Sequence, residues 1–171
     1  MRGTVEVHQY LVERGIRHEF YRLERPLRRI DEAAAVLGLP PSHVAAVELF
    51  EAAGTLPIVA VVPAVTCASA DAVAAAAGAR RVWPAKTSRV TELTGFFPGW
   101  LPPIGHERAV RIVVDEALLA VEVLYAPGGD PGVMLVLRSS DLVRAAAATT
   151  ASLSTSAAGI SQSEALEVPA G

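Results

Sequence analysis

The spacing of apolar residues along the chain predicts short helices and short strands in mixed order. Segments whose apolar positions recur every three to four residues are expected to be helical, because that spacing gathers them on one helix face. The predicted helices lie between Thr4, as N-cap, and Gly15, between Asp31 and Gly38, over 69–77, over 87–93, and from Ser139 or Ser140, as N-cap, into the alanines that follow. Alternating or continuous apolar runs predict strands over 18–23, 44–50, 56–62, 80–83, 109–114, 121–125 and 133–137.

The connections between these segments indicate the fold class. Residues 51–54 separate two apolar runs and predict a hairpin, although the run over 44–50 also fits a helix. The Pro/Gly-rich residues 127–132 predict a second chain reversal. An order that mixes hairpins with strand–helix units favours an α+β fold, with a mixed and partly barrel-like sheet flanked by helices, over a doubly wound parallel fold.

Length and composition favour one globular domain followed by a tail. A chain of 171 residues can bury one core, and a composition of 51% hydrophobic and 19% charged residues excludes wholesale disorder. From Thr149 onward the chain is rich in Ser, Ala and Thr and shows little periodicity. We therefore expect a domain over residues 1–148 and a mobile tail over 149–171.

Several functional classes lose support because their residues or patterns are missing. No apolar stretch is long enough to span a bilayer and no secretory signal is present, so we expect a cytoplasmic protein with no membrane partner. Cys67 is the only cysteine and the four histidines form no i, i+4 pair, so neither a disulfide framework nor a metal site is expected. The glycine-rich nucleotide loops and the nucleophile elbow of hydrolases are also missing, and no cofactor is expected.

The charge pattern allows local contacts with phosphate. A net charge of −3 argues against strong nonspecific binding to nucleic acid. Two local runs are nevertheless basic: Arg22, Arg25, Arg28 and Arg29 form one, and Arg80, Arg81, Lys86 and Arg89 form the other. Each run fits either a contact with a phosphate backbone or a solvated face.

The most unusual segment is the loop over residues 94–105, which contains three Gly, three Pro and three aromatic residues. Glycines let a backbone approach a ligand, and prolines restrict the loop to few conformations. Backbone N–H groups fixed in this way could hold a developing oxyanion, while Phe96, Phe97 or Trp100 could stack on a base. The alternative is a rigid structural turn whose aromatic residues fill the core.

These patterns resemble those of the YbaK-like, prolyl-tRNA-synthetase-associated editing domains, which hydrolyse misacylated tRNA. The resemblance covers most of residues 5–147. Its marks are the segments 33–38, 44–50, 58–63, 74–80, 94–95, 99–103, 104–105 and 140–142, together with Asp115. The most specific mark is the run Gly-Trp-Leu-Pro-Pro over 99–103, which matches the family's G-x-x-x-P loop.

The resemblance implies hydrolysis of the ester that joins an amino acid to the 3′-terminal adenosine of tRNA. The implied partners are the 3′ end of an aminoacyl-tRNA and an aminoacyl-tRNA synthetase. By carry-over of the loop motif, Gly99 and Pro103 are expected catalytic-site residues, with Asp115 as a weaker candidate. The residues expected to border the substrate are His43, Ala46, Lys86, Thr94, Gly95, Trp100, Pro102, Ile104 and Gly105.

Proton transfer has several candidates and no clear favourite. His43, Glu48, His106 and Asp115 each lie near a motif and can carry or move a proton. Asp115 equally fits the cap of a turn or helix, and Glu48 equally fits a side chain that faces solvent from its strand.

Ala46 marks a departure from the family pattern, whose members place a lysine at the corresponding strand position. Alanine has no donor to replace an ammonium, so another group must act or catalysis is lost. Lys86 is the only lysine of the chain, and we hypothesise that it enters the same pocket from a neighbouring segment. A solvated turn lysine is the alternative.

Three functional hypotheses remain open. The first is a free-standing editing enzyme that acts in trans and selects small amino acids by pocket size, because a missing methyl group gives a synthetase little discrimination. The second, favoured by Ala46, is a noncatalytic module that binds tRNA, an aminoacyl ester analogue or a protein. The third is a small-molecule hydrolase that uses the same loop without tRNA.

Overall fold

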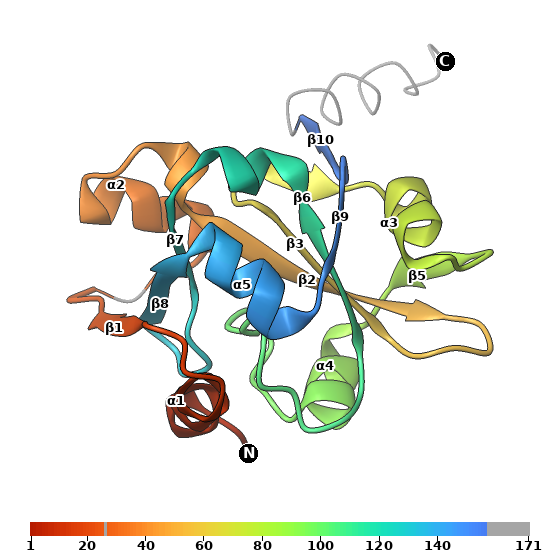
Figure 1. Cartoon of the computed structure of the whole chain (residues 1–171), viewed down its shortest axis with the longest axis horizontal. Coiled ribbons are helices and arrows are strands. Elements are labelled where there is room, and N and C mark those ends of the chain that lie inside the picture. Colours follow the sequence, from red (N-terminus) through yellow and green to blue (C-terminus); the bar gives the residue numbers. More distant parts are fainter. Residues whose placement is uncertain (26, 157–171) are drawn as a thin grey trace, which may run out of the picture.

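The computed structural model describes residues 1–25 and 27–156 (Figure 1). The helices are α1 (Thr4–Glu13), α2 (Ala33–Leu37), α3 (Ala70–Ala77), α4 (Thr87–Thr94) and α5 (Ser139–Ala146), with 3-10 turns η1 (Ile30–Glu32), η2 (Pro41–His43) and η3 (Glu116–Ala120). The strands are β1 (Glu19–Arg22), β2 (Ala45–Ala52), β3 (Ile58–Pro63), β4 (Thr66–Ala68), β5 (Val82–Pro84), β6 (Arg111–Asp115), β7 (Val123–Pro127), β8 (Val133–Arg138), β9 (Thr149–Ala151) and β10 (Ser154–Ser156).

The hairpin of β2 and β3 forms the centre of the larger sheet. β3 is buried along its whole length, as its continuous apolar run predicts. β2 pairs with it antiparallel, from Ala45 opposite Pro63 to Phe50 opposite Ile58, so the predicted hairpin is confirmed and the helical alternative for 44–50 is wrong. The sheet has the order β5-β2-β3-β6-β9, in which β6 pairs parallel with both β3 and β9. It is therefore a mixed sheet.

Different layers cover the two faces of this sheet. On one face, Phe50 and Val62 pack with Val73 of α3. On the other face, Val59 and Val61 pack with apolar residues of α1, of α5 and of the antiparallel sheet β1-β8-β7. Figure 1 shows α3 on the right of the molecule, with α1 and the smaller sheet on the left. The predicted α+β class, with helices flanking a mixed sheet, is confirmed.

A third layer lies on the outer face of the smaller sheet. Ala33 and Ala34 of α2 pack there on Met134 of β8 and on Val44, which immediately precedes β2. Val44 also forms an isolated parallel bridge with Tyr125 of β7. The larger and the smaller sheet therefore meet at the start of β2. Within the described residues, no helix is long and apolar enough to cross a membrane.

The predicted N-caps of α1 and α5 are wrong. α1 begins at Thr4, with Gly3 as N-cap, and the Thr4 N–H donates to Asp130 Oδ2 over 3.0 Å. α5 has no side-chain cap, because Ser139 Oγ instead donates to the carbonyl oxygen of Val121 over 2.6 Å. Both corrections arise from partners that are distant in the sequence and that a local pattern does not reveal.

The other helix signals give a mixed result. Ser69 caps α3 by accepting the N–H of Ala72 over 3.3 Å, and Gly78 ends that helix in a left-handed conformation, as predicted. Asp31, predicted to cap α2, lies in η1 and binds Arg29 at 2.7 Å instead. α2 therefore begins after a 3-10 turn rather than directly after a cap.

The predicted mobile tail is wrong for residues 149–156. β9 pairs with β6, with Thr149 opposite Val113, and β10 pairs antiparallel with β4, with Ser154 opposite Ala68. Between these strands Leu153 is only 1% exposed and belongs to the core cluster under α3. The fold therefore extends to residue 156, and the rest of the predicted tail lies outside the described residues.

Candidate functional site

The glycine- and proline-rich loop begins where α4 ends. Gly95 adopts a left-handed conformation with φ 84°, and its N–H donates to the carbonyl oxygen of Thr91 over 2.8 Å. Thr94 is buried, and its Oγ1 accepts the N–H of Phe96 over 3.2 Å. A Cβ atom on Gly95 would lie 2.7 Å from the Arg2 side chain. Thr94 and Gly95 are therefore buried residues that set the backbone conformation at the start of the loop.

The middle of the loop is held by packing and by His106. Phe96, Leu101 and Ile104 are buried in the core. This part of the loop is therefore a structural turn whose side chains fill the core, which was the alternative to a ligand site. His106 Nε2 donates a hydrogen bond to the carbonyl oxygen of Pro102 over 2.8 Å. Burial lowers the pKa of His106 to about 4, so the imidazole is neutral at pH 7. His106 thus braces the loop, and nothing in its contacts makes it a proton carrier.

The end of the loop packs against α1. Arg2 Nε donates to the carbonyl oxygen of Gly105 over 3.0 Å, and a Cβ atom on Gly105 would lie 3.4 Å from the backbone of Val7. Gly105 thus allows close packing of two backbones. Pro103 is buried as well. Of the predicted site residues, Pro102, Pro103, Ile104 and Gly105 lie on the interior side of the loop.

Gly99 and Trp100 form the part of the loop that reaches the surface. Gly99 is exposed, has φ 86°, and has nothing within 4 Å of the place where a Cβ would be. Glycine is therefore needed there for the backbone conformation rather than for space. Within the described residues, the Gly99 N–H donates to no protein acceptor. Trp100 packs on the α2 layer, with Leu23, Val44 and Met134.

Trp100 also borders an open hollow of about 260 Å³. The other residues that line it are Arg22, Leu23, Glu24, Arg25, Leu27, Pro131 and Gly132. Apolar walls with arginines among the lining residues suit a ligand that combines an apolar part with an anionic group. Arg22 and Arg25, which the charge pattern singled out only as part of a basic run, therefore lie beside the candidate loop.

The start of β2 lies close to this hollow. Val44 belongs to the cluster on which Trp100 packs, and Ala46, two residues further on, pairs with Val62. His43 ends η2 directly before Val44 and is partly exposed. The fold therefore brings His43, next to Val44, towards Trp100, whereas Ala46 packs against the core cluster that includes Val73 of α3.

Glu48 follows Ala46 on the same face of β2 and does not face open solvent. Its Oε2 accepts the N–H of Ala68 in β4 over 3.1 Å. Burial raises the pKa of the Glu48 carboxyl, and the hydrogen bond from Ala68 opposes that shift only in part. The solvent-facing alternative is wrong, and Glu48 is a half-buried carboxylate that binds β4.

Lys86 lies beside the C-terminal half of β2, whereas Trp100 lies near the start of that strand. The N–H of Ala85 donates to the carbonyl oxygen of Leu49 over 2.8 Å, which fixes the start of α4 beside that residue. Val44 and Leu49 are five residues apart on the strand, a separation of about 17 Å. Lys86 itself is exposed at the N-terminus of α4. The structure does not bring Lys86 and Trp100 together.

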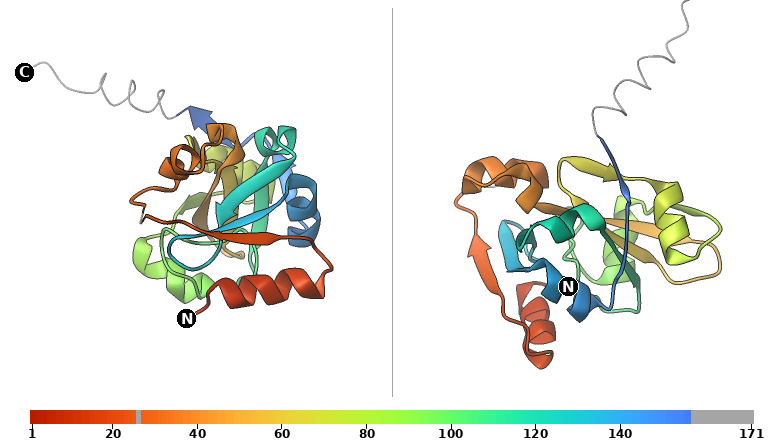
Figure 2. Two further views of the ribbon diagram at one scale, coloured as in Figure 1. Left: turned by 90° about the vertical axis from the view of Figure 1, so that its left-hand side faces the viewer. Right: turned by 45° about the horizontal axis from the view of Figure 1, so that its top comes forward.

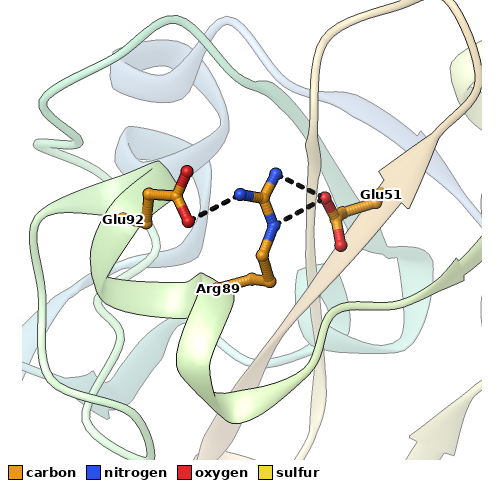
Figure 3. Close-up of polar contacts among 3 residues, drawn as sticks. All are labelled: Glu51, Arg89 and Glu92. Atoms are coloured by element: carbon orange, nitrogen blue, oxygen red, sulfur yellow. Dashed lines mark hydrogen bonds and ion pairs between the residues drawn. The ribbon is translucent and has the colours of Figure 1, made fainter.

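An ion-pair cluster fixes α4 in this position (Figure 3). Arg89 NH2 lies 2.8 Å from Glu51 of β2, and Arg89 NH1 lies 2.6 Å from Glu92 of the same helix. These contacts raise the pKa of Arg89 further above its already high value. The Arg89 guanidinium therefore pairs with two carboxylates. Of the second basic run, Arg80, Arg81 and Lys86 are the residues that could still contact phosphate.

Both carboxylate oxygens of Asp115 accept hydrogen bonds from backbone N–H groups. It is 3% exposed, its Oδ1 accepts the N–H of Ala117 over 2.9 Å, and its Oδ2 accepts the N–H of Leu153 over 3.3 Å. Asp115 therefore caps η3 and ties the segment between β9 and β10 to β6. The capping alternative that the sequence offered is confirmed.

Potential metal ligands are not gathered in the described part of the chain. No group of three or more His, Cys, Asp or Glu side chains lies close enough together there to hold a metal ion. Cys67 is a partly exposed free thiol on β4.

Comparison with known proteins agrees with this geometry. The model of the aminoacyl-tRNA editing domain family matches residues 24–145. The chain is similar to the crystal structure of hypothetical protein APE2540, with 27% identity and a TM-score of 0.82 over 88% of this chain and 99% of that chain. It is also similar to the crystal structure of a provisionally assigned trans-editing enzyme for prolyl-tRNA synthetase, with 24% identity and a TM-score of 0.81 over 89% and 96% of the two chains. The second likeness shows a shared fold.

The sequence did not single out Leu23, Leu27, Pro131 and Gly132, which complete the hollow beside Trp100. Pro131 and Gly132 carried a signal only as part of the predicted turn over 127–132, and Leu23 only as the end of the predicted strand over 18–23. Leu23 and Leu27 belong to irregular chain that follows β1, and no motif marks them as site residues.

Proposed function

Because this chain belongs to the aminoacyl-tRNA editing domain family, we propose that it hydrolyses the ester between an amino acid and the 3′-terminal adenosine of tRNA. The supporting observation is the exposed turn at Gly99, next to the hollow that Trp100 lines. The aminoacyl end binds in this hollow, and the upstream phosphates meet the arginines beside it. The loop is preorganised, because His106 and the buried residues around it are already in place before substrate binds.

Ester hydrolysis by water needs a donor for the oxyanion of the tetrahedral intermediate. The N–H of Gly99 supplies it in this proposal, since it is exposed and donates to no protein acceptor within the described residues. A vicinal ribose hydroxyl of the substrate assists the attacking water, so no protein nucleophile is required. Trp100 and the neighbouring leucines hold the amino-acid side chain, and the size of the hollow selects small residues.

Ala46 supports a second candidate function. The resemblance to the family implies a lysine at this strand position, and Ala46 supplies no charge or donor there. A module that binds the 3′ end of tRNA without hydrolysing it fits the same loop and hollow. The two functions differ in turnover rather than in binding.

Action in trans and association with a synthetase are further parts of the proposal. The likeness to a provisionally assigned trans-editing enzyme extends over 96% of that chain, which supports a domain that acts on tRNA released by a synthetase. A prolyl-tRNA synthetase is the partner that this likeness favours.

A deacylation screen tests the proposal. Purified protein is incubated with tRNAs charged with alanine, serine, cysteine, threonine or proline, beside Gly99→Val and the matched control Gly54→Val. Both glycines have positive φ and open space around them, but Gly54 lies in the β2–β3 hairpin loop, away from the hollow. We expect release of one small amino acid that Gly99→Val abolishes and Gly54→Val retains.

The other outcomes separate the alternatives. Binding of tRNA without release of any amino acid would reject hydrolysis and support the noncatalytic module. Equal turnover of a free aminoacyl ester and of the charged tRNA would point to a small-molecule hydrolase. Equal loss in both glycine variants would show that the Gly99 turn has no particular role.

A further inference from the structure

Three open hollows lie along β1 and the chain that follows it. The first, of about 720 Å³, is lined by residues that include Arg17, His18, Tyr125 and Arg138. The second, of about 350 Å³, is lined by Tyr21, Glu24, Arg25 and Val36. The third is the hollow beside Trp100, which shares Glu24 and Arg25 with the second. We call the three together the β1 trough.

We propose that the β1 trough binds the unpaired 3′ end of tRNA, from Arg17 and Arg138 at one end to Trp100 at the other. This inference rests on the proposed function, because it assigns the path by which the substrate reaches the Gly99 turn. It adds a binding surface that begins outside the residues of the candidate loop.

The surface is open because β1 is an edge strand whose outer face is only partly covered. Phe20 faces the core, whereas Glu19 and Tyr21 alternate to the outer face. α2 covers that face at Met134 but leaves Tyr21 47% exposed and Val123 38% exposed. The left view of Figure 2 shows β1 crossing the front of the molecule, with α1 below and α2 above.

The charge of the trough is opposite to that of the whole chain. Its charged residues are Arg17, Glu19, Arg22, Glu24, Arg25 and Arg138, four cations and two anions, in a protein with a net charge of −3. Within the described residues, none of these four arginines lies within 4 Å of a carboxylate. They are also exposed, so their guanidinium groups are available to phosphate.

Aromatic side chains lie at intervals along the same surface. Tyr125 lines the first hollow, Tyr21 the second and Trp100 the third. A groove that combines cations with aromatic faces is the arrangement by which proteins hold single-stranded nucleic acid, with phosphates on the cations and bases on the rings. A duplex would offer phosphates to the arginines but no free base to the rings.

The length of the trough suits a short single strand. Arg17 and Arg25 are eight residues apart in largely extended chain, which spans at most about 28 Å. That length accommodates only a few nucleotides, as the unpaired 3′ end of a tRNA requires. With the terminal adenosine at Trp100, the preceding bases reach Tyr21, and the junction with the acceptor stem meets Arg17 and Arg138.

Binding of uncharged RNA tests the trough independently of hydrolysis. Fluorescence anisotropy compares a labelled RNA hairpin that carries the unpaired 3′ end with the same hairpin cut back to a blunt end. The test variant is Arg17→Glu with Arg138→Glu, and the matched control is Arg80→Glu with Arg81→Glu, which reverses two exposed arginines next to β5. We expect the wild type to prefer the hairpin with the unpaired end, the trough variant to bind it about tenfold more weakly or worse, and the control to bind nearly as the wild type does.

A second pair of variants tests the aromatic part. Tyr21→Phe keeps an aromatic face and should bind as the wild type does, whereas Tyr21→Ser should bind more weakly. Equal affinities for the two hairpins, no effect of the trough variant, or a larger effect in the control would each overturn the proposal. All of these residues are exposed, so a circular dichroism melt is expected to show an intact fold in every variant.

The deacylation screen keeps this proposal separate from the proposed function. If the wild type hydrolyses charged tRNA and the trough variant shows unchanged KM and unchanged RNA affinity, the trough is wrong and the editing function stands. If RNA binding depends on Arg17 and Arg138 but no amino acid is released, the trough stands and hydrolysis is wrong.

Discussion

His106 donates a hydrogen bond from Nε2 to the carbonyl oxygen of Pro102 over 2.8 Å, at the C-terminal end of the loop that carries Gly99. The ring also meets Phe96 edge-on, with centroids 6.1 Å apart. A neutral imidazole in these surroundings makes the loop geometry depend on pH.

The first prediction concerns this pH dependence. The pKa of His106 is lowered from 6.5 to about 4 in the folded protein, so between these values the unfolded chain binds the proton more readily. Its contribution to stability is present above pH 6.5 and is lost as the pH falls towards 4. We expect the Tm of the wild type to fall more steeply over this range than that of His106→Gln, whose amide can still donate to Pro102. Parallel curves for the two proteins would contradict the assignment.

The stability contribution of Glu48 should change with pH in the opposite direction to that of His106. Burial raises the pKa of its carboxyl above 4.5, so the charged form costs the folded state stability at neutral pH. Glu48→Gln keeps an acceptor for the Ala68 N–H and removes the charge. We predict a higher Tm than wild type at pH 7 and little difference at pH 4. If Glu48 also takes a proton during hydrolysis, the same variant loses kcat while its KM is retained.

Asp115 is predicted to act on stability. Asp115→Ala removes the acceptor for two backbone N–H groups in a buried position and should cost about 2–4 kcal/mol in urea unfolding. Asp71→Ala, in the exposed first turn of α3, is the control and should cost much less. Under conditions in which Asp115→Ala remains folded, kcat for deacylation should stay near the wild-type value. A large loss of kcat in the folded variant would return Asp115 to the catalytic candidates.

Leu153 should prove essential for the fold although it lies beyond residue 148. Its side chain is 1% exposed under α3, so Leu153→Ala should cost about 2–5 kcal/mol. Val65→Ala removes a 45% exposed side chain and should cost far less. A chain ended at residue 148 should be destabilised more than either variant. Equal stability of the truncated and full chains would mean that β9 and β10 contribute nothing.

Lys86 gives a fifth prediction. Its position beside the second half of β2, about 17 Å along the strand from Val44, leads us to expect that Lys86→Met changes neither kcat nor the affinity for tRNA. The control is Lys86→Arg, which keeps the positive charge at this exposed position. Loss in the Met variant and recovery in the Arg variant would instead support the hypothesis that this ammonium serves the substrate.

Sequence patterns were sufficient for elements that local spacing determines. The apolar runs of β2 and β3 predicted the hairpin, Ser69 and Gly78 marked the ends of α3, and the composition of residues 94–105 identified the loop. In each case the information lies within one short continuous segment of the chain. The family that these motifs indicated is confirmed.

Patterns were insufficient wherever distant segments determine the structure. β9 and β10 consist of small polar residues without alternation, and they are ordered by pairing with β6 and β4. Thr4 meets Asp130, 126 positions away, and Arg17 lines the same hollow as Arg138. A local pattern also did not show which side of the loop faces inward, so Pro102 and Ile104 were expected beside the substrate although they are buried.

The neutral state of His106 has a consequence for ionic strength. Contacts between uncharged groups are not screened by dissolved ions, so the loop around Gly99 should keep its shape in concentrated salt. The arginines of the β1 trough are exposed charges, and their attraction for phosphate weakens as salt is added. Salt should therefore weaken the capture of a tRNA along the trough, while the shape of the loop around Gly99 stays the same.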